Sequence, residues 1–133
     1  MILMIDDEPH YVKTYIDELE FSGYQVKLEK DVDAGFKFLT ENKDQIQLVI
    51  LDIMMSPGRL LAEVNTQNGL RTGVYLFDRI RALAPDLPIL ILTNVSDPRV
   101  AARFQGQEKC RFLRKEDYLP FELVEEVKRF LEP

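Results

Sequence analysis

The chain has 133 residues, of which 46% are hydrophobic and 30% charged, as expected for a globular domain with one substantial core. The net charge of −6 argues against nucleic-acid binding, and no apolar run approaches the roughly 18 residues of a membrane span. The first apolar run stops at Asp6 with no basic segment before it, unlike a signal peptide. A single cysteine, Cys110, cannot form an internal disulfide, which favours a reducing, cytoplasmic location.

Strand-like runs and helical segments alternate five times along the chain. The first half predicts strands at 2–5, 25–29 and 47–51. It also predicts a helix that begins at Pro9 and stops at Gly23, and a second helix capped by Asp31. Apolar residues at helical spacing define the inward faces of these helices: Val12, Ile16 and Leu19 in the first, and Ala34, Phe38 and Leu39 in the second.

The second half continues the alternation after a long segment. It predicts a helix that closes near Pro85, a strand opened by Pro88, a short helix that starts at Asp97-Pro98, a strand at 110–113 and a final helix. Alternating strands and helices imply an α/β fold with a doubly wound, five-stranded parallel sheet. We expect one domain over residues 1–133, with no room for a second. The inward-facing residues of these last three helices are Leu76, Ile80 and Leu83; Val100, Ala101 and Phe104; and Leu123, Val124, Val127 and Leu131.

Polar residues that can handle a phosphoryl group follow four of the strands. Asp6-Asp7 follow the first strand, Asp52 the third, Thr93 the fourth, and Arg114-Lys115 the fifth. In such a sheet, ligands bind just beyond the carboxyl ends of the strands, so these side chains should converge at one edge. Whether Arg114 or Lys115 points there depends on where the fifth strand begins.

In this order, with a helix between each, Asp6-Asp7, Asp52, Thr93 and Lys115 resemble the receiver domain of two-component response regulators over essentially the whole chain. The resemblance implies a flavodoxin-like (βα)5 fold with strand order 2-1-3-4-5. It also implies that Asp52 accepts a phosphoryl group. A carboxylate suffices as nucleophile because the phosphoryl transition state is loose and needs mainly positioning and charge neutralisation.

The resemblance further implies a Mg²⁺ ion held by Asp7 directly, by Asp6 largely through water, by Asp52, and by the backbone carbonyl of Met54. Oxygen ligands of this kind suit Mg²⁺. Without a cation, the clustered carboxylates should repel each other and raise at least one pKa. The acids after the first strand also suit the start of a helix, and both interpretations can hold together.

By resemblance, Lys115 pairs with the phosphoryl oxygens, Thr93 donates its hydroxyl to them, and Phe112 is the aromatic residue that switches with Thr93. A core phenylalanine without a switching role is the alternative for Phe112. The sequence departs from the family at two positions: Glu116 replaces the proline that usually follows the lysine, and Asn94 replaces a small residue.

The segment between Asp52 and the third helix is longer than the family usually has, and the surplus gives an extended loop at 56–72. Gly69 or Gly73 can supply the glycine that the family has before this helix. The segment is interpreted either as a mobile surface loop or as a docking or lid element beside Asp52. Three of its residues can form a short amphipathic turn: Leu60, Leu61 and Val64.

The sequence therefore predicts a signalling domain, not an enzyme beyond its own phosphorylation and dephosphorylation. The expected phosphodonor is a histidine kinase or a histidine phosphotransfer protein. The output is expected to be phosphorylation-dependent binding of a protein effector, with no direct nucleic-acid or membrane binding. By resemblance, the fourth helix, fifth strand and fifth helix form the contact face, which can also support a homodimer.

Two other functions compete with this prediction. The first is a pseudo-receiver, an interaction module that is not phosphorylated; Asn94, Glu116 and the long segment favour it, and the complete acidic set disfavours it. The second is a Mg²⁺-dependent phosphohydrolase with an aspartyl-phosphate. That class usually has an acid two residues after its nucleophile, where this chain has Met54.

Overall fold

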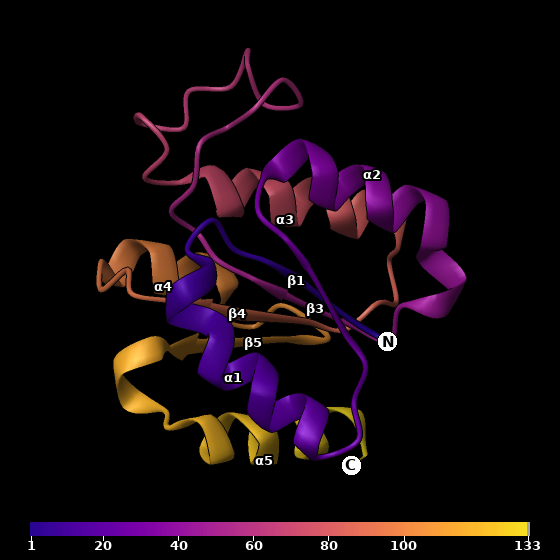
Figure 1. Ribbon diagram of the computed structural model, residues 1–133. Helices are drawn as coiled ribbons and strands as arrows, with labels where there is room; N and C mark the ends of the chain where they lie inside the picture. The colour runs from indigo at the N-terminus through magenta and orange to yellow at the C-terminus, as the bar shows by residue number, and fades with distance from the viewer. Residues whose placement is uncertain (133) are drawn as a thin grey trace.

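The computed structural model describes residues 1–132, so Pro133, the last residue of the predicted domain, lies outside it. Five parallel strands form one sheet in the order β2-β1-β3-β4-β5 (Figure 1), which confirms the predicted flavodoxin-like fold. The strands are β1 (Ile2–Ile5), β2 (Val26–Glu29), β3 (Leu48–Leu51), β4 (Ile89–Thr93) and β5 (Cys110–Arg114). The helices are α1 (Pro9–Phe21), α2 (Val32–Asn42), α3 (Thr72–Leu83), α4 (Pro98–Phe104) and α5 (Pro120–Leu131), with short 3-10 turns η1 (Lys43–Gln45) and η2 (Lys115–Asp117).

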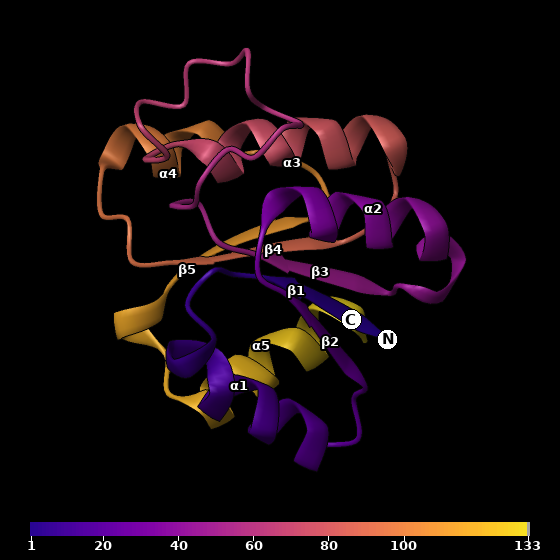
Figure 2. The same ribbon diagram turned by 45° about the horizontal axis from the view of Figure 1, so that its top comes forward.

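Helices cover both faces of the sheet. Helices α1 and α5 lie on one face, and α2, α3 and α4 lie on the other (Figures 1 and 2). Along β1, Ile2 and Met4 pack toward α1 and α5, whereas Leu3 and Ile5 pack toward α2 and α3. This arrangement explains why β1, β3 and β4 are continuous apolar runs while the edge strand β2 alternates. No helix within residues 1–132 is long and apolar enough to cross a membrane.

The predicted helix starts are confirmed, but the inward faces differ in detail. Leu83 of α3, Ala101 of α4 and Leu131 of α5 are only half-buried, and α1 and α2 differ further. The side chains of Asp31 and Asp97 accept hydrogen bonds from Ala34 N and Arg99 N and cap α2 and α4. In α1 the buried residues are Val12, Tyr15 and Leu19, and Ile16 is only half-buried. In α2 the buried residues are Val32, Gly35 and Leu39, and the helix packs closely against β1 at Gly35. Ala34 and Phe38 are therefore only half-buried.

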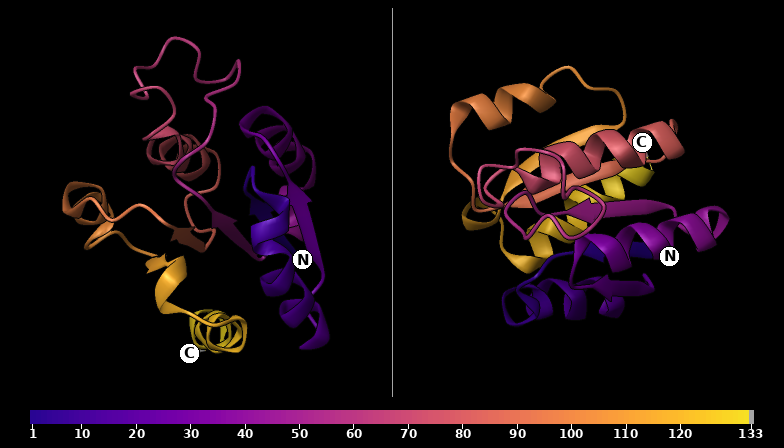
Figure 3. Two further views of the ribbon diagram at one scale, coloured as in Figure 1. Left: turned by 60° about the vertical axis from the view of Figure 1, so that its left-hand side comes forward. Right: turned by 90° about the horizontal axis from the view of Figure 1, so that it is seen from above.

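The extended loop runs from Ser56 to the start of α3, and we call residues 56–71 the insert. It projects beyond α3 on the face covered by α2, α3 and α4 (Figure 3). Its two ends meet, because Met55 N donates to Gly69 O at 3.1 Å and the Thr72 hydroxyl donates to Met55 O. The insert is therefore a closed Ω-type loop whose base sits on the chain just after β3.

A second anchor holds the outer part of the insert to α2. The Asp33 carboxylate accepts hydrogen bonds from Arg59 N at 2.8 Å and Leu60 N at 2.9 Å. Gly58 allows this approach, because its φ is +62° and a Cβ there would lie 2.7 Å from the carboxylate. Leu61 is fully buried in the core, with Leu60 packed against it. These contacts favour an anchored element over a mobile surface loop.

Asp33→Ala is expected to cost about 1 kcal/mol of unfolding free energy, because two backbone N–H groups lose their acceptor. The hydrogen bonds from Arg59 N and Leu60 N hold the pKa of Asp33 below its usual 3.8. The stabilisation should therefore be present above that pH and be lost as the pH falls below it. Urea unfolding and amide exchange at Arg59 and Leu60, each carried out over a range of pH, measure the loss of stability and its pH dependence. Asp33→Asn, which keeps an acceptor oxygen, should lose less, and equal losses in the two variants would contradict the anchor.

Candidate functional site

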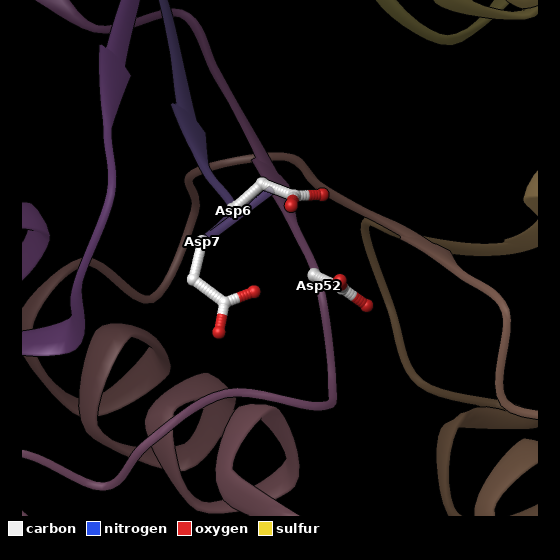
Figure 4. A group of neighbouring side chains, drawn as sticks. All are labelled: Asp6, Asp7 and Asp52. Atoms are coloured by element: carbon white, nitrogen blue, oxygen red, sulfur yellow. The ribbon is translucent and has the colours of Figure 1, made fainter. Parts of the chain in front are cut away.

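Three carboxylates meet at the carboxyl edge of the sheet. Strands β1 and β3 pair in parallel with Ile5 opposite Leu51, so the residues that follow them emerge side by side. Asp6, Asp7 and Asp52 each place an oxygen within 4.8 Å of the others (Figure 4). Asp6 and Asp52 are buried, and Asp7 is exposed. We call these three residues the acidic site.

Lys115 lies against the two buried acids. Its ammonium group donates to Asp6 Oδ2 at 2.9 Å and to Asp52 Oδ2 at 3.3 Å, and the side chain is buried. Arg114 instead pairs with Glu116 at the surface, which settles the open choice between Arg114 and Lys115. Strand β5 extends one residue beyond its predicted end, to Arg114, and the 3-10 turn η2 then begins at Lys115.

Tyr15, which belongs to no sequence motif of the site, supports the backbone that carries Lys115. Its hydroxyl lies 3.0 Å from the carbonyl oxygens of both Lys115 and Tyr118 and shares its proton between them. The spacing of Tyr15 from Val12 and Leu19, three and four residues, was the available signal that it faces inward.

The acidic site carries more negative charge than Lys115 can balance. Burial and the neighbouring Asp52 raise the pKa of Asp6 to about 6, although Lys115 and the Glu8 N–H favour its ionised form. Burial and Asp52 also raise the pKa of Asp7. Burial alone would lower the pKa of Lys115, but the attraction of Asp52 and Asp6 raises it overall.

Three close carboxylates with excess negative charge suit a hard divalent cation. Oxygen ligands of this number are typical for Mg²⁺, which usually keeps several waters. A cation would relieve the repulsion that raises the pKa of Asp6 and Asp7. Met54, expected to contribute its carbonyl, lies two residues beyond Asp52 and is exposed. The residues present therefore fit the ion that the sequence implied.

Thr93 and Phe112 lie on the neighbouring strands. Thr93 is fully buried, and its Oγ1 accepts a hydrogen bond from Val95 N at 3.2 Å. Phe112 stacks on Phe104 of α4, with ring centroids 5.8 Å apart. Phe104 meets Phe77 of α3 edge-on at 5.1 Å. Within residues 1–132, no hydrogen bond joins Thr93 to the acidic site, whereas Lys115 is hydrogen-bonded to both Asp6 and Asp52.

Residues of the insert line two hollows of about 290 Å³ each, and one of them is also lined by Asp7 of the acidic site. The first, which we call the acid-side hollow, is lined by Asp7, Glu8, residues 54–56 and residues 68–70. The second, the helix-side hollow, lies between the insert and residues 94–97 before α4. Arg71 and Asp97 approach to 3.8 Å across this second hollow. No local sequence pattern predicts either hollow, because both depend on how the insert folds back.

Comparison with known proteins agrees with this geometry. Residues 2–128 match the family described as response regulator receiver domain. The chain is 31% identical over 122 residues to the response regulator MprA of Mycobacterium sp. (strain KMS), covering 90% of this chain and 43% of that protein. It is 30% identical over 108 residues to the transcriptional regulatory protein GlrR of Escherichia coli (strain K12), covering 79% of this chain and 21% of that protein. The chain thus spans less than half the length of these relatives.

Solved structures share the same fold. A response regulator receiver domain protein from Clostridium thermocellum superposes with a TM-score of 0.78 and 25% identity, covering 98% of this chain and 92% of the other. The receiver domain of the hybrid histidine kinase CckA gives a TM-score of 0.72 at 23% identity, covering 98% of both chains. With the match over residues 2–128, this chain belongs to the response regulator receiver domain family and is a receiver domain of two-component signalling.

Proposed function

We propose that Asp52 accepts a phosphoryl group from the histidine of a histidine kinase or a histidine phosphotransfer protein, with Mg²⁺ at the acidic site. In this transfer, a bond forms between a carboxylate oxygen of Asp52 and phosphorus while the bond from phosphorus to the donor's imidazole nitrogen breaks. The observation that carries the proposal is the position of the Asp52 carboxylate, 3.3 Å from the Lys115 ammonium and within 4.8 Å of oxygens of Asp6 and Asp7.

Each residue of the site has a proposed role. Lys115, already bonded to Asp6 and Asp52, neutralises charge on the phosphoryl oxygens as they arrive. Mg²⁺ bound by Asp6, Asp7, Asp52 and the carbonyl of Met54 would neutralise further charge there. Such preorganised charges stabilise the transition state with little reorganisation.

Thr93 is proposed to report the phosphoryl group to the rest of the domain. Its Oγ1 accepts from Val95 N, which leaves the hydroxyl proton available to donate to a phosphoryl oxygen. Movement of Thr93 would then leave space for the half-buried ring of Phe112. Because Phe112 stacks on Phe104, such a switch would be transmitted to α4.

The partners follow from this mechanism as proposals. The domain, proposed as residues 1–133 with an extended loop at 56–72, would act in the cytoplasm as a phosphorylated signalling protein. The face formed by α4, β5 and α5 would bind a downstream protein effector and can support a homodimer. The homologues, which include a transcriptional regulatory protein, support an effector output, and their greater length allows for an attached effector domain.

The test is to incubate the protein with Mg²⁺ and a small phosphoramidate donor and to measure its intact mass. A single phosphate adduct is expected, and Asp52→Asn should abolish it. Asp44→Asn, which changes an exposed acid in η1, should leave the adduct unchanged. An adduct that persists in Asp52→Asn would place the acceptor elsewhere. No adduct in the unaltered protein would favour the pseudo-receiver, and rapid phosphomonoester turnover would favour a hydrolase.

A further inference from the structure

The insert contains a left-handed turn next to the acidic site. Gln67, Asn68 and Gly69 follow one another with φ angles of 55°, 60° and 87°. This conformation costs most residues other than glycine about 1–2 kcal/mol, and asparagine adopts it more readily than glutamine does. Strain of this kind persists only where surrounding contacts fix it, and it is concentrated at functional sites.

The contacts that fix the turn attach it to the chain just beyond Asp52. The buried Thr66 accepts a hydrogen bond from Gly69 N through its hydroxyl at 3.1 Å and one from Arg71 N through its carbonyl at 2.9 Å. Gly69 O accepts from Met55 N, and a Cβ at Gly69 would lie 2.7 Å from Met55 O. The turn therefore holds its position relative to the acidic site.

The turn places Asn68 in the wall of the acid-side hollow, which Asp7 and Glu8 also line. Asn68 is exposed, and its carboxamide has no hydrogen-bond partner among the described residues 1–132. Gln67, one residue earlier, lines the helix-side hollow instead. Gln67 and Asn68 thus line different hollows.

We propose that Asn68 is a positioning residue of the metal site, whose carboxamide contacts a water molecule of a cation held by Asp6, Asp7 and Asp52. Mg²⁺ usually keeps several waters, and a carboxamide can both donate to and accept from them. Residues that hydrogen-bond to the ligands of a metal, without binding the metal themselves, contribute strongly to the affinity for that metal. This inference rests on the Mg²⁺ part of the proposed function, and it assigns to the insert a role in holding the ion.

The test measures the affinity of the unphosphorylated protein for Mg²⁺, by calorimetry and by the NMR shifts of the Asp7 and Asp52 amides. Asn68→Gly removes the carboxamide from a position where glycine is unstrained, and it should weaken Mg²⁺ binding about tenfold. Gln67→Gly is the matched control, since it also introduces glycine into the left-handed turn, at a residue that lines the other hollow, and it should leave the affinity unchanged. Asn68→Asp, which adds a charge at the same position, should tighten binding.

The outcomes separate this inference from the proposed function. Equal Mg²⁺ affinity in Asn68→Gly and the unaltered protein would overturn the role of Asn68 and leave the proposed function standing. Equal weakening in Gln67→Gly would also overturn it, because the effect would then come from the shape of the turn. An unaltered protein that binds no Mg²⁺ would overturn both.

Discussion

Gly73→Ala is expected to destabilise the protein by about 3 kcal/mol and to disrupt the acidic site, because a methyl group there would collide with backbone. Gly73 lies in the first turn of α3, with its N–H donating to Ile53 O at 2.8 Å. A Cβ at this position would meet Asp52 O and lie 2.6 Å from Ile53 Cα. No side chain can rotate to relieve this contact, so α3 or the chain at Asp52 must move.

Gly35→Ala in α2 is the matched control for this prediction. Both substitutions gain about 1 kcal/mol of helix propensity, and both glycines are buried. The Cβ at Gly35 would lie 2.7 Å from Ile5 Cδ1 and 2.9 Å from Ile5 Cγ1, so the added methyl group meets a side chain and not backbone. Urea unfolding should therefore show a much smaller loss for Gly35→Ala, and only Gly73→Ala should lower the yield of the phosphate adduct. Equal losses in both variants would contradict the backbone collision.

Asp6→Asn is expected to make the metal-free protein more stable than the unaltered one at pH 7, by a free energy on the order of 1 kcal/mol or more. The pKa of Asp6 is raised from 3.8 to about 6, so the folded state holds this proton more tightly than the unfolded state. The contribution of Asp6 to stability is thus greatest below pH 4 and is lost as the pH rises through 6. An asparagine cannot ionise, and its oxygen can still accept the hydrogen bond from Glu8 N.

Unfolding free energies from pH 4 to 7.5 in a chelator test this prediction. The unaltered protein should lose stability across that range, and Asp6→Asn should remove most of the decline. Added Mg²⁺ should restore stability to the unaltered protein at pH 7, because the ion favours the ionised acids. An Asp6→Asn protein that is less stable than the unaltered one in chelator would show that the bond from Lys115 outweighs the repulsion.

Sequence periodicity predicted every strand and helix but could not order the strands. Runs such as 48–51 and 89–92 show that a strand is buried on both faces, and they do not say which strand lies beside it. The order 2-1-3-4-5 came from the family resemblance, which the sheet confirms. Tyr15 was missed in favour of Ile16, because the position of the inward stripe on a helix depends on how the helix packs.

At the site, the sequence predicted which side chains converge but not their bonds. The positions of Asp6, Asp7 and Asp52 follow from strand ends, whereas the choice of Lys115 over Arg114 needed the observed end of β5. The contact from Asp33 to the insert spans residues 26 and 27 positions apart, and no local pattern encodes it. The Asn68-Gly69 pair did carry a turn signal, which indicates left-handed backbone.

The pairing of Met55 with Gly69 has a consequence for how this domain tolerates change. Because the chain leaves and re-enters the fold at adjacent points, the residues between them add no length to the path from β3 to α3. Loop closure entropy rises only slowly with length, by about 0.6 kcal/mol for each doubling. We therefore expect this point to accept grafted or shortened segments while Asp52 keeps its place, provided that the core position of Leu61 stays filled.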